Sequence, residues 1–125
     1  MANRTPTTTK DIKGSENNAI LKVVWTGLLN GDVGLPVFYP DYTLASWQIS
    51  GTFGAGGSIS MQGSNDGTNF ITLEDPQGGA QTKTAAALEE IEQPCLALRP
   101  TVTAGDGTTS LVVTLVLWKT FAGAK

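Results

Sequence analysis

Paired acidic side chains are the only arrangement in this sequence that suggests catalysis. Glu89, Glu90 and Glu92 lie close together, and Glu74 is followed directly by Asp75. Hydrolysis of a glycosidic bond needs two carboxyl groups about 5–9.5 Å apart across a cleft. Neighbouring acids on an exposed loop do not form such a pair, because each is solvated separately. We therefore expect that the chain is not an enzyme.

Two counts in the composition limit nucleophilic and metal-dependent chemistry. The chain contains no histidine and one cysteine, Cys95. A Ser-His-Asp triad, a Cys-His pair, a histidine-ligated zinc site and a thiolate cluster therefore cannot be built from it. Cys95 stands in the apolar segment 94–98, where we expect a small buried hydrophobic side chain. No cofactor is expected.

Two turns rich in oxygen atoms remain as candidates for a ligand site. Residues 65–69 read Asn-Asp-Gly-Thr-Asn, and residues 105–108 read Gly-Asp-Gly-Thr. A calcium ion takes six to eight oxygen ligands, and neither turn provides a bidentate acid at a suitable offset. Asx side chains in turns commonly hydrogen-bond to their own backbone. Turn formation is the favoured interpretation, and a calcium site is the alternative.

These two turns are copies of one pattern, in which Asp-Gly-Thr separates two apolar segments. One copy spans residues 59–73 and the other spans residues 98–115. Asp-Gly between runs of apolar, β-branched and aromatic residues is a strong hairpin signal. Gly67 and Gly107 can take the positive φ that such turns require. The pattern predicts two β-hairpins.

Alternation of apolar and polar residues predicts further strands. The clearest case is residues 46–53, where Trp47, Ile49 and Phe53 fall on one face. Strands are expected at 19–27, 46–53, 58–63, 70–73, 82–87, 96–102 and 111–118. The fold class is all-β: an antiparallel, jelly-roll-like β-sandwich of about seven or eight strands, with a single closed barrel as the alternative. The expected core comprises Trp25, Trp47, Phe53, Phe70, Leu73, Leu98, Leu111, Val113, Leu115 and Leu117.

Two of these strands have open interpretations. Residues 82–87 are expected to lead into an acidic loop, and a helical turn there is the alternative. Residues 111–118 are apolar on both faces, which is typical of a central strand that is covered on each side. One of the two covers can be a neighbouring subunit rather than the chain's own core.

The chain divides into a polar arm and one domain. Residues 1–18 are rich in threonine and carry no hydrophobic period, so we expect a flexible N-terminal arm, with a partner-ordered arm as the alternative. Residues 19–125 form a single β-sandwich domain. The loop 35–45 places aromatic side chains between prolines, where strand alternation does not force them inward. The candidate partner-binding residues are Thr7, Thr8, Thr9 and Ile12 in the arm, and Phe38, Tyr39 and Tyr42 in the loop.

Charge and hydropathy exclude several classes of partner. Charged residues make up 15% of the chain, and the formal net charge is −3. Nucleic-acid binding needs clustered Lys and Arg, and the eight cations here are scattered. No apolar run approaches the roughly 20 residues that span a membrane. The polar N-terminus does not resemble a secretory signal, so we expect a soluble chain assembled where it is made.

Three motifs carry a resemblance to a known class of proteins. They are Gln62-Gly-Ser-Asn-Asp-Gly-Thr-Asn-Phe-Ile-Thr-Leu73, then Leu98-Arg-Pro100, then Gly105-Asp-Gly-Thr-Thr-Ser-Leu-Val-Val-Thr-Leu115. Together they resemble small β-sandwich virion proteins of tailed bacteriophages, most closely head decoration (cement) proteins. The resemblance covers about residues 46–118, and it transfers no catalytic residue.

The resemblance implies a structural role in the virion. A decoration protein is made in the host cytoplasm, sits on the outer capsid surface as a homo-oligomer, often a homotrimer, and clamps neighbouring subunits of the major capsid protein. The alternative is a glycan- or receptor-binding β-sandwich module of a phage head fibre or tail, for which Tyr39 or Tyr42 would contact the sugar.

Overall fold

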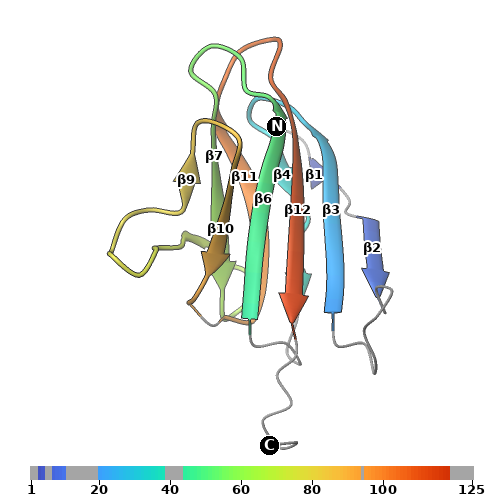
Figure 1. Ribbon diagram of the computed structural model, residues 1–125, viewed down its shortest axis with the longest axis vertical. Helices are drawn as coiled ribbons and strands as arrows, with labels where there is room; N and C mark the ends of the chain where they lie inside the picture. Colours follow the sequence, from blue (N-terminus) through green and yellow to red (C-terminus); the bar gives the residue numbers. More distant parts are fainter. Residues whose placement is uncertain (1–2, 5–6, 11–19, 39–43, 94, 119–125) are drawn as a thin grey trace, which may run out of the picture.

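The described part of the protein is a sandwich of two β-sheets. The computed structural model describes residues 3–4, 7–10, 20–38, 44–93 and 95–118, and these residues contain no helix. Figure 1 shows the two sheets packed face to face, with the strands of both layers running along the long axis. The predicted all-β antiparallel sandwich is confirmed, and the alternative of a single closed barrel is not formed by these residues.

The front layer in Figure 1 is a five-stranded, fully antiparallel sheet. Its order is β10 (Ala87–Ile91), β6 (Leu44–Thr52), β12 (Ser110–Trp118), β3 (Ile20–Leu28) and β2 (Thr7–Lys10). The strand β12 is central, as its apolar sequence predicted, and it pairs along its length with β6 and β3.

The second layer is a seven-stranded sheet built around a long antiparallel pair. Its main order is β1 (Asn3–Arg4), β4 (Val33–Gly34), β11 (Ala97–Ala104), β7 (Ser58–Ser64) and β8 (Ile71–Thr72). In addition β5 (Val37–Phe38) pairs with β11, and β9 (Thr82–Lys83) pairs with β7. Five of the twelve strands have only two residues, which is too short for alternation to show in a sequence and explains why fewer strands were predicted.

The core lies between the sheets and follows the predicted alternation. Leu21, Val23 and Trp25 of β3 point inward, and they meet Ile59 and Met61 of β7 within one apolar cluster. Most of the predicted core residues belong to this cluster, and Phe53 packs partly against it. Burial of each large aliphatic side chain contributes about 1.5–3 kcal/mol to folding. Apolar packing between the two sheets is therefore the main source of stability.

Phe70 is an exception among the predicted core residues. Its side chain is half-buried, and the Arg99 guanidinium carbon lies 4.2 Å from the centre of its ring. The same guanidinium donates from Nε to Gln62 Oε1 at 2.9 Å. A cation over an aromatic face is favourable where both remain accessible to water. The ring is therefore held against Arg99 and not in the apolar cluster.

The second predicted hairpin is wrong, because β11 and β12 belong to different sheets. The Asp106 turn is instead an arch that crosses from one layer to the other. It lies beside the connection between β6 and β7, which also crosses between the sheets (Figure 1). Asp106 Oδ2 accepts a hydrogen bond from Ala55 N at 2.9 Å, and Thr109 Oγ1 donates to Phe53 O at 2.7 Å. The Asx hydrogen bonding of this turn was predicted correctly, whereas the connection was not, and Gly107 does not take the expected positive φ.

Two other predictions need correction. The segment expected to be a flexible arm contributes β2, which pairs with β3 from Thr7↔Val24 to Lys10↔Leu21. The edge of β3 offers backbone N–H and C=O groups for pairing. The threonine-rich segment can pair with them although its sequence shows no alternation of apolar and polar residues. The acidic segment is a strand and not a loop or a helical turn, because Glu89 and Glu90 lie within β10 and only Thr82–Lys83 of the expected strand forms β9.

One buried amide joins the two layers. Gln81 is fully buried, and its Oε1 accepts a hydrogen bond from Trp47 Nε1 at 2.9 Å. Its Nε2 donates to Glu90 O at 2.9 Å, so the side chain binds two strands of the five-stranded sheet. Its backbone N–H donates to Leu73 O at 2.7 Å, and its carbonyl accepts from Met61 N at 3.0 Å. Gln81 therefore fixes β6 and β10 over β7.

Replacing Gln81 with leucine should destabilise the fold strongly. The Gln81→Leu variant keeps the side-chain volume but leaves the Trp47 indole N–H and the Glu90 carbonyl without these partners. Each unsatisfied buried group costs about 1–3 kcal/mol, so we expect the free energy of unfolding to fall by about 2–5 kcal/mol. Urea denaturation measures this change. The matched control Gln77→Leu, at an exposed loop position, should change it by less than about 0.5 kcal/mol. Equal stability of the two variants would contradict the assignment.

Candidate functional site

The first Asp-Gly-Thr turn is made rigid by one carboxylate. Asp66 Oδ1 accepts hydrogen bonds from the backbone N–H groups of Thr68 and Asn69, both at 2.8 Å, and from Ser64 Oγ at 2.9 Å. Asp66 Oδ2 accepts a fourth from Asn69 Nδ2 at 2.8 Å. These bonds, the backbone N–H of Asn69 first, hold the pKa of Asp66 well below its usual 3.8. The Asp66 carboxylate, which accepts all four of these hydrogen bonds, therefore forms the centre of the turn.

A hollow of about 480 Å³ opens beside this turn. It lies between the β7–β8 hairpin and the segment 93–95, and its lining residues are Gly63, Ser64, Asn65, Asp66, Asn69, Ile71, Thr72, Leu73, Gln93 and Cys95. Side chains fasten the two walls to each other, because Gln93 Oε1 accepts from Glu74 N at 2.5 Å and Asn65 Oδ1 accepts from Leu96 N at 3.2 Å. The hollow is therefore pre-formed, as ligand and peptide sites commonly are.

Exposed apolar side chains border the same turn. Ile71 lines the hollow and is 71% exposed. Phe38 is 51% exposed, and its ring lies 3.4 Å from the position where a Cβ on Gly67 would stand. Leu96 is 38% exposed and follows Cys95 directly. We call the Asp66 turn, its hollow and these three side chains the hairpin corner.

Among the predicted partner-binding residues that the structure describes, only Phe38 lies at the hairpin corner. Thr7, Thr8 and Thr9 form β2, at the edge of the five-stranded sheet farthest from β10. Ile12, Tyr39 and Tyr42 lie outside the described residues. Contact of these six residues with a partner stays a prediction.

The candidate catalytic acids do not gather in the hollow. Glu89 forms an ion pair with Lys83, and Asp75 Oδ1 accepts hydrogen bonds from the backbone N–H groups of Gln77 and Gly79 at 3.0 and 2.8 Å. Glu90 points to the other side of β10 from Glu89. Within the described ranges, no group of three or more acidic or cysteine side chains could hold a metal ion. Two of these acids thus support local structure.

The hollow could not be found from the sequence. Gln93 and Cys95 are some thirty residues from Ser64 along the chain, and the segment 93–96 is fastened to the hairpin by single side chains. The hydrophobic periodicity of the sequence gives no indication of such a contact. The one available signal was the Asn-Asp-Gly-Thr-Asn turn itself, which indicated turn chemistry but not the hollow beside it.

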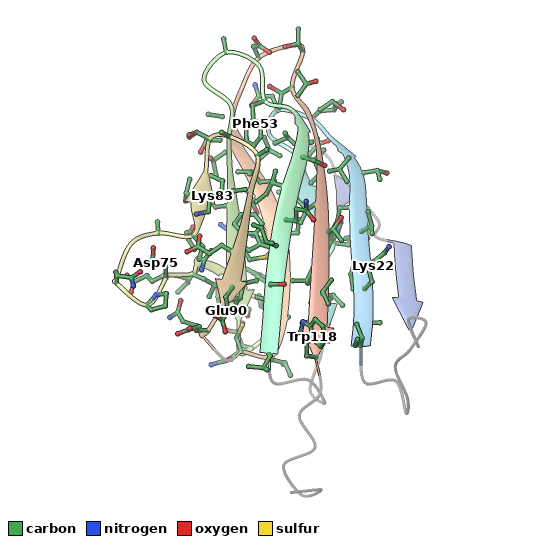
Figure 2. All side chains as sticks on the ribbon, viewed as in Figure 1. Lys22, Phe53, Asp75, Lys83, Glu90 and Trp118 are labelled. Atoms are coloured by element: carbon green, nitrogen blue, oxygen red, sulfur yellow. The ribbon has the colours of Figure 1, made fainter. Side chains whose placement is uncertain are left out.

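The other face with unusual composition is the outer face of the five-stranded sheet, turned toward the viewer in Figure 2. Its outward positions alternate with the buried residues of each strand. On β10, β6, β12 and β3 they are Leu88, Glu90, Leu44, Ser46, Gln48, Ser50, Thr52, Ser110, Val112, Thr114, Val116, Trp118, Ile20, Lys22, Val24 and Thr26. Only Glu90 and Lys22 in this set are charged. The face is broad and nearly neutral.

One of three comparisons with known proteins finds similar structures. No protein-family model matches the sequence, and no curated protein matches it. The fold is similar to that of the SPBc2 prophage-derived protein YomS, with a TM-score of 0.61, 10% identity, and coverage of 78% of this chain and 93% of that one. At 10% identity this likeness shows a shared fold alone.

Two cupin-type structures are more distant. The Schizosaccharomyces pombe Cnp3 cupin domain gives a TM-score of 0.46 at 9% identity, and Bacillus subtilis oxalate decarboxylase gives 0.47 at 12%. The alignments cover 92% and 94% of this chain but only 60% and 26% of those chains. In the described residues, no helix is long and apolar enough to cross a membrane.

The arch that Asp106 holds should weaken in acid. Hydrogen bonds, first from the Thr108 hydroxyl and then from the Ala55 backbone N–H, lower the pKa of Asp106 from 3.8 to about 2. A carboxyl group whose pKa is lower in the folded than in the unfolded state stabilises the fold above about pH 4, and this contribution disappears as the pH falls toward 2. Asp106→Asn should therefore flatten the decline of Tm between pH 4 and pH 2, measured by circular dichroism. Glu92→Gln, at an exposed position away from both turns, should follow the wild type. An unchanged slope in Asp106→Asn would contradict the assignment.

Proposed function

We propose that this chain is a structural protein of a tailed-phage virion, which binds the outer capsid surface and stabilises contacts between major capsid subunits. The observation that carries the proposal is the hairpin corner, where exposed Phe38, Ile71 and Leu96 surround a rigid, pre-formed hollow. The corner is built by the Gln62–Leu73 motif that carries the resemblance to decoration proteins. The shared fold with a prophage-derived protein supports the same class.

The corner suits docking better than chemistry. A flat partner surface can bury its three apolar side chains, each worth up to about 1.5–3 kcal/mol when fully buried. A loop of the capsid can enter the hollow and hydrogen-bond to its polar groups. Because Asp66 fixes the turn before contact, little conformational entropy is lost on binding. The corner therefore offers affinity through shape and area.

Stabilisation of the capsid follows from mass action. A ligand that binds only the assembled state shifts the equilibrium toward that state by RT ln(1 + [L]/Kd). A protein that contacts two capsid subunits at once resists their separation for the same reason. The chain needs no reactive group for this role.

Capsid binding should depend on the hairpin corner. We expect the wild-type chain to co-sediment with capsids, to be stripped by denaturant, and to rebind when it is added back. Phe38→Ser and Ile71→Ser should each weaken rebinding at least tenfold, because each removes apolar area from the contact. Leu29→Ser is the matched control, since Leu29 is 45% exposed but follows β3 at the opposite end of the sandwich.

Three outcomes would overturn the proposal. The first is failure of the wild-type chain to bind capsids. The second is rebinding of both corner variants with wild-type affinity. The third is binding to a glycan array that is lost in Tyr39→Ala or Tyr42→Ala, which would indicate the glycan-binding alternative. Circular dichroism of each variant shows whether the fold is retained.

A further inference from the structure

The outer face of the five-stranded sheet carries its two charges at matching places. The ladder register puts Glu90 of β10 opposite Ser46 of β6, Ser46 opposite Val116 of β12, and Val116 opposite Lys22 of β3. Glu90 and Lys22 therefore stand in one row, on the two sides of the β6–β12 pair (Figure 2). The line between β6 and β12 is equidistant from them, because neighbouring strands are evenly spaced.

We propose that a second copy of this chain packs against this face, about a twofold axis between β6 and β12. The axis would run within about 15° of the strands, which is half of the roughly 30° at which aligned sheets pack. Such a rotation exchanges the positions of β10 and β3, and those of β6 and β12. Glu90 then faces the partner's Lys22, and Lys22 faces the partner's Glu90. The charges of the face are self-complementary under this operation.

Several other outward residues match under the same rotation, whereas Ser46 faces the partner's Val116 and Ser50 faces the partner's Val112. In the neighbouring row, Leu88 faces the partner's Val24, and Gln48 faces the partner's Thr114. Leu44 faces the partner's Trp118 at the end of the sheet. Leu88, Leu44 and Trp118 are 69%, 47% and 43% exposed in the single chain. Away from the two serine–valine positions, the rotation thus opposes apolar to apolar, amide to hydroxyl and anion to cation.

The size of the face is sufficient for a stable dimer. The rotation overlaps four strands of each face, because β2 lies beyond the partner's β10. Four strands spaced about 4.8 Å apart, with a nine-residue central strand rising about 3.4 Å per residue, cover roughly 590 Å². Two such faces bury roughly 1,200 Å², at the lower end of the range of about 1,200–2,000 Å² for specific interfaces. A homotrimer would need this face to fit a different surface of its neighbour. The self-complementary charges favour the twofold pair.

Charge exchange tests the pairing directly. Sedimentation equilibrium at low ionic strength should show wild-type chains of 13.0 kDa associating to twice that mass. Glu90→Lys and Lys22→Glu should each raise the dimer dissociation constant at least tenfold, because like charges then face each other twice per dimer. The double variant Glu90→Lys/Lys22→Glu should restore association. Added salt should reduce the differences.

A pair of apolar variants provides the control for area. Leu88→Ser should weaken the dimer, whereas Ile71→Ser, at an equally exposed position on the other sheet, should not. A monomer at every concentration, a trimer, or a double variant no better than the single ones would overturn the inference. The inference does not depend on capsid binding, since Ile71→Ser is expected to impair capsid binding and leave the dimer intact.

Discussion

The buried side chain of Gln81 gives the stacking of the two sheets a defined direction. Apolar burial between sheets is strong but has no direction, so by itself it does not fix which strand lies over which. The Gln81 amide has direction, because it accepts from the Trp47 indole and donates to the Glu90 carbonyl. Its backbone is tied at the same time to Met61 and Leu73. These four hydrogen bonds tie the layers together at one offset, and the bond from Trp25 Nε1 to Leu35 O at 3.0 Å adds a second tie.

Gln81 also supports both proposed binding surfaces. Its backbone bonds hold Leu73 and the connection after it against β7, which keeps the β7–β8 hairpin and its hollow in place. Its bond to Glu90 O holds β10 at the edge of the five-stranded sheet. That strand carries Glu90, which is one of the two charged residues on the outer face of β10, β6, β12 and β3. The hairpin corner and the outer face therefore depend on the same buried amide.

The long strands could be predicted from the sequence, and the connections between them could not. Trp47 and Ile49 alternate with polar residues on β6, and this local pattern survives in the fold because one face of the sheet is buried. The two Asp-Gly-Thr turns are locally alike, yet Asp66 closes a hairpin and Asp106 holds an arch between sheets. The difference arises from partners such as Ala55, about fifty residues away. A local motif carries no information about those partners.

The candidate site could likewise be predicted only in part from the sequence. Phe38 was identified because prolines on both sides remove it from regular alternation, and it lies exposed against the Asp66 turn. The hollow depends on Gln93 and Cys95 reaching the hairpin, which only the three-dimensional structure reveals. Gln81 was missed for a related reason, because a lone glutamine after two glycines and an alanine has the composition of a solvated loop.

Hydrogen–deuterium exchange on the capsid tests the central claim most directly, namely that this protein acts through a rigid surface that covers another assembly. Exchange is compared between the free chain and the chain bound to intact capsids. We expect slower exchange in residues 62–73 and 93–97 on binding, and no change in the arches at 53–57 and 105–109. Slower exchange at the arches alone, or no change at the hairpin corner, would contradict the claim.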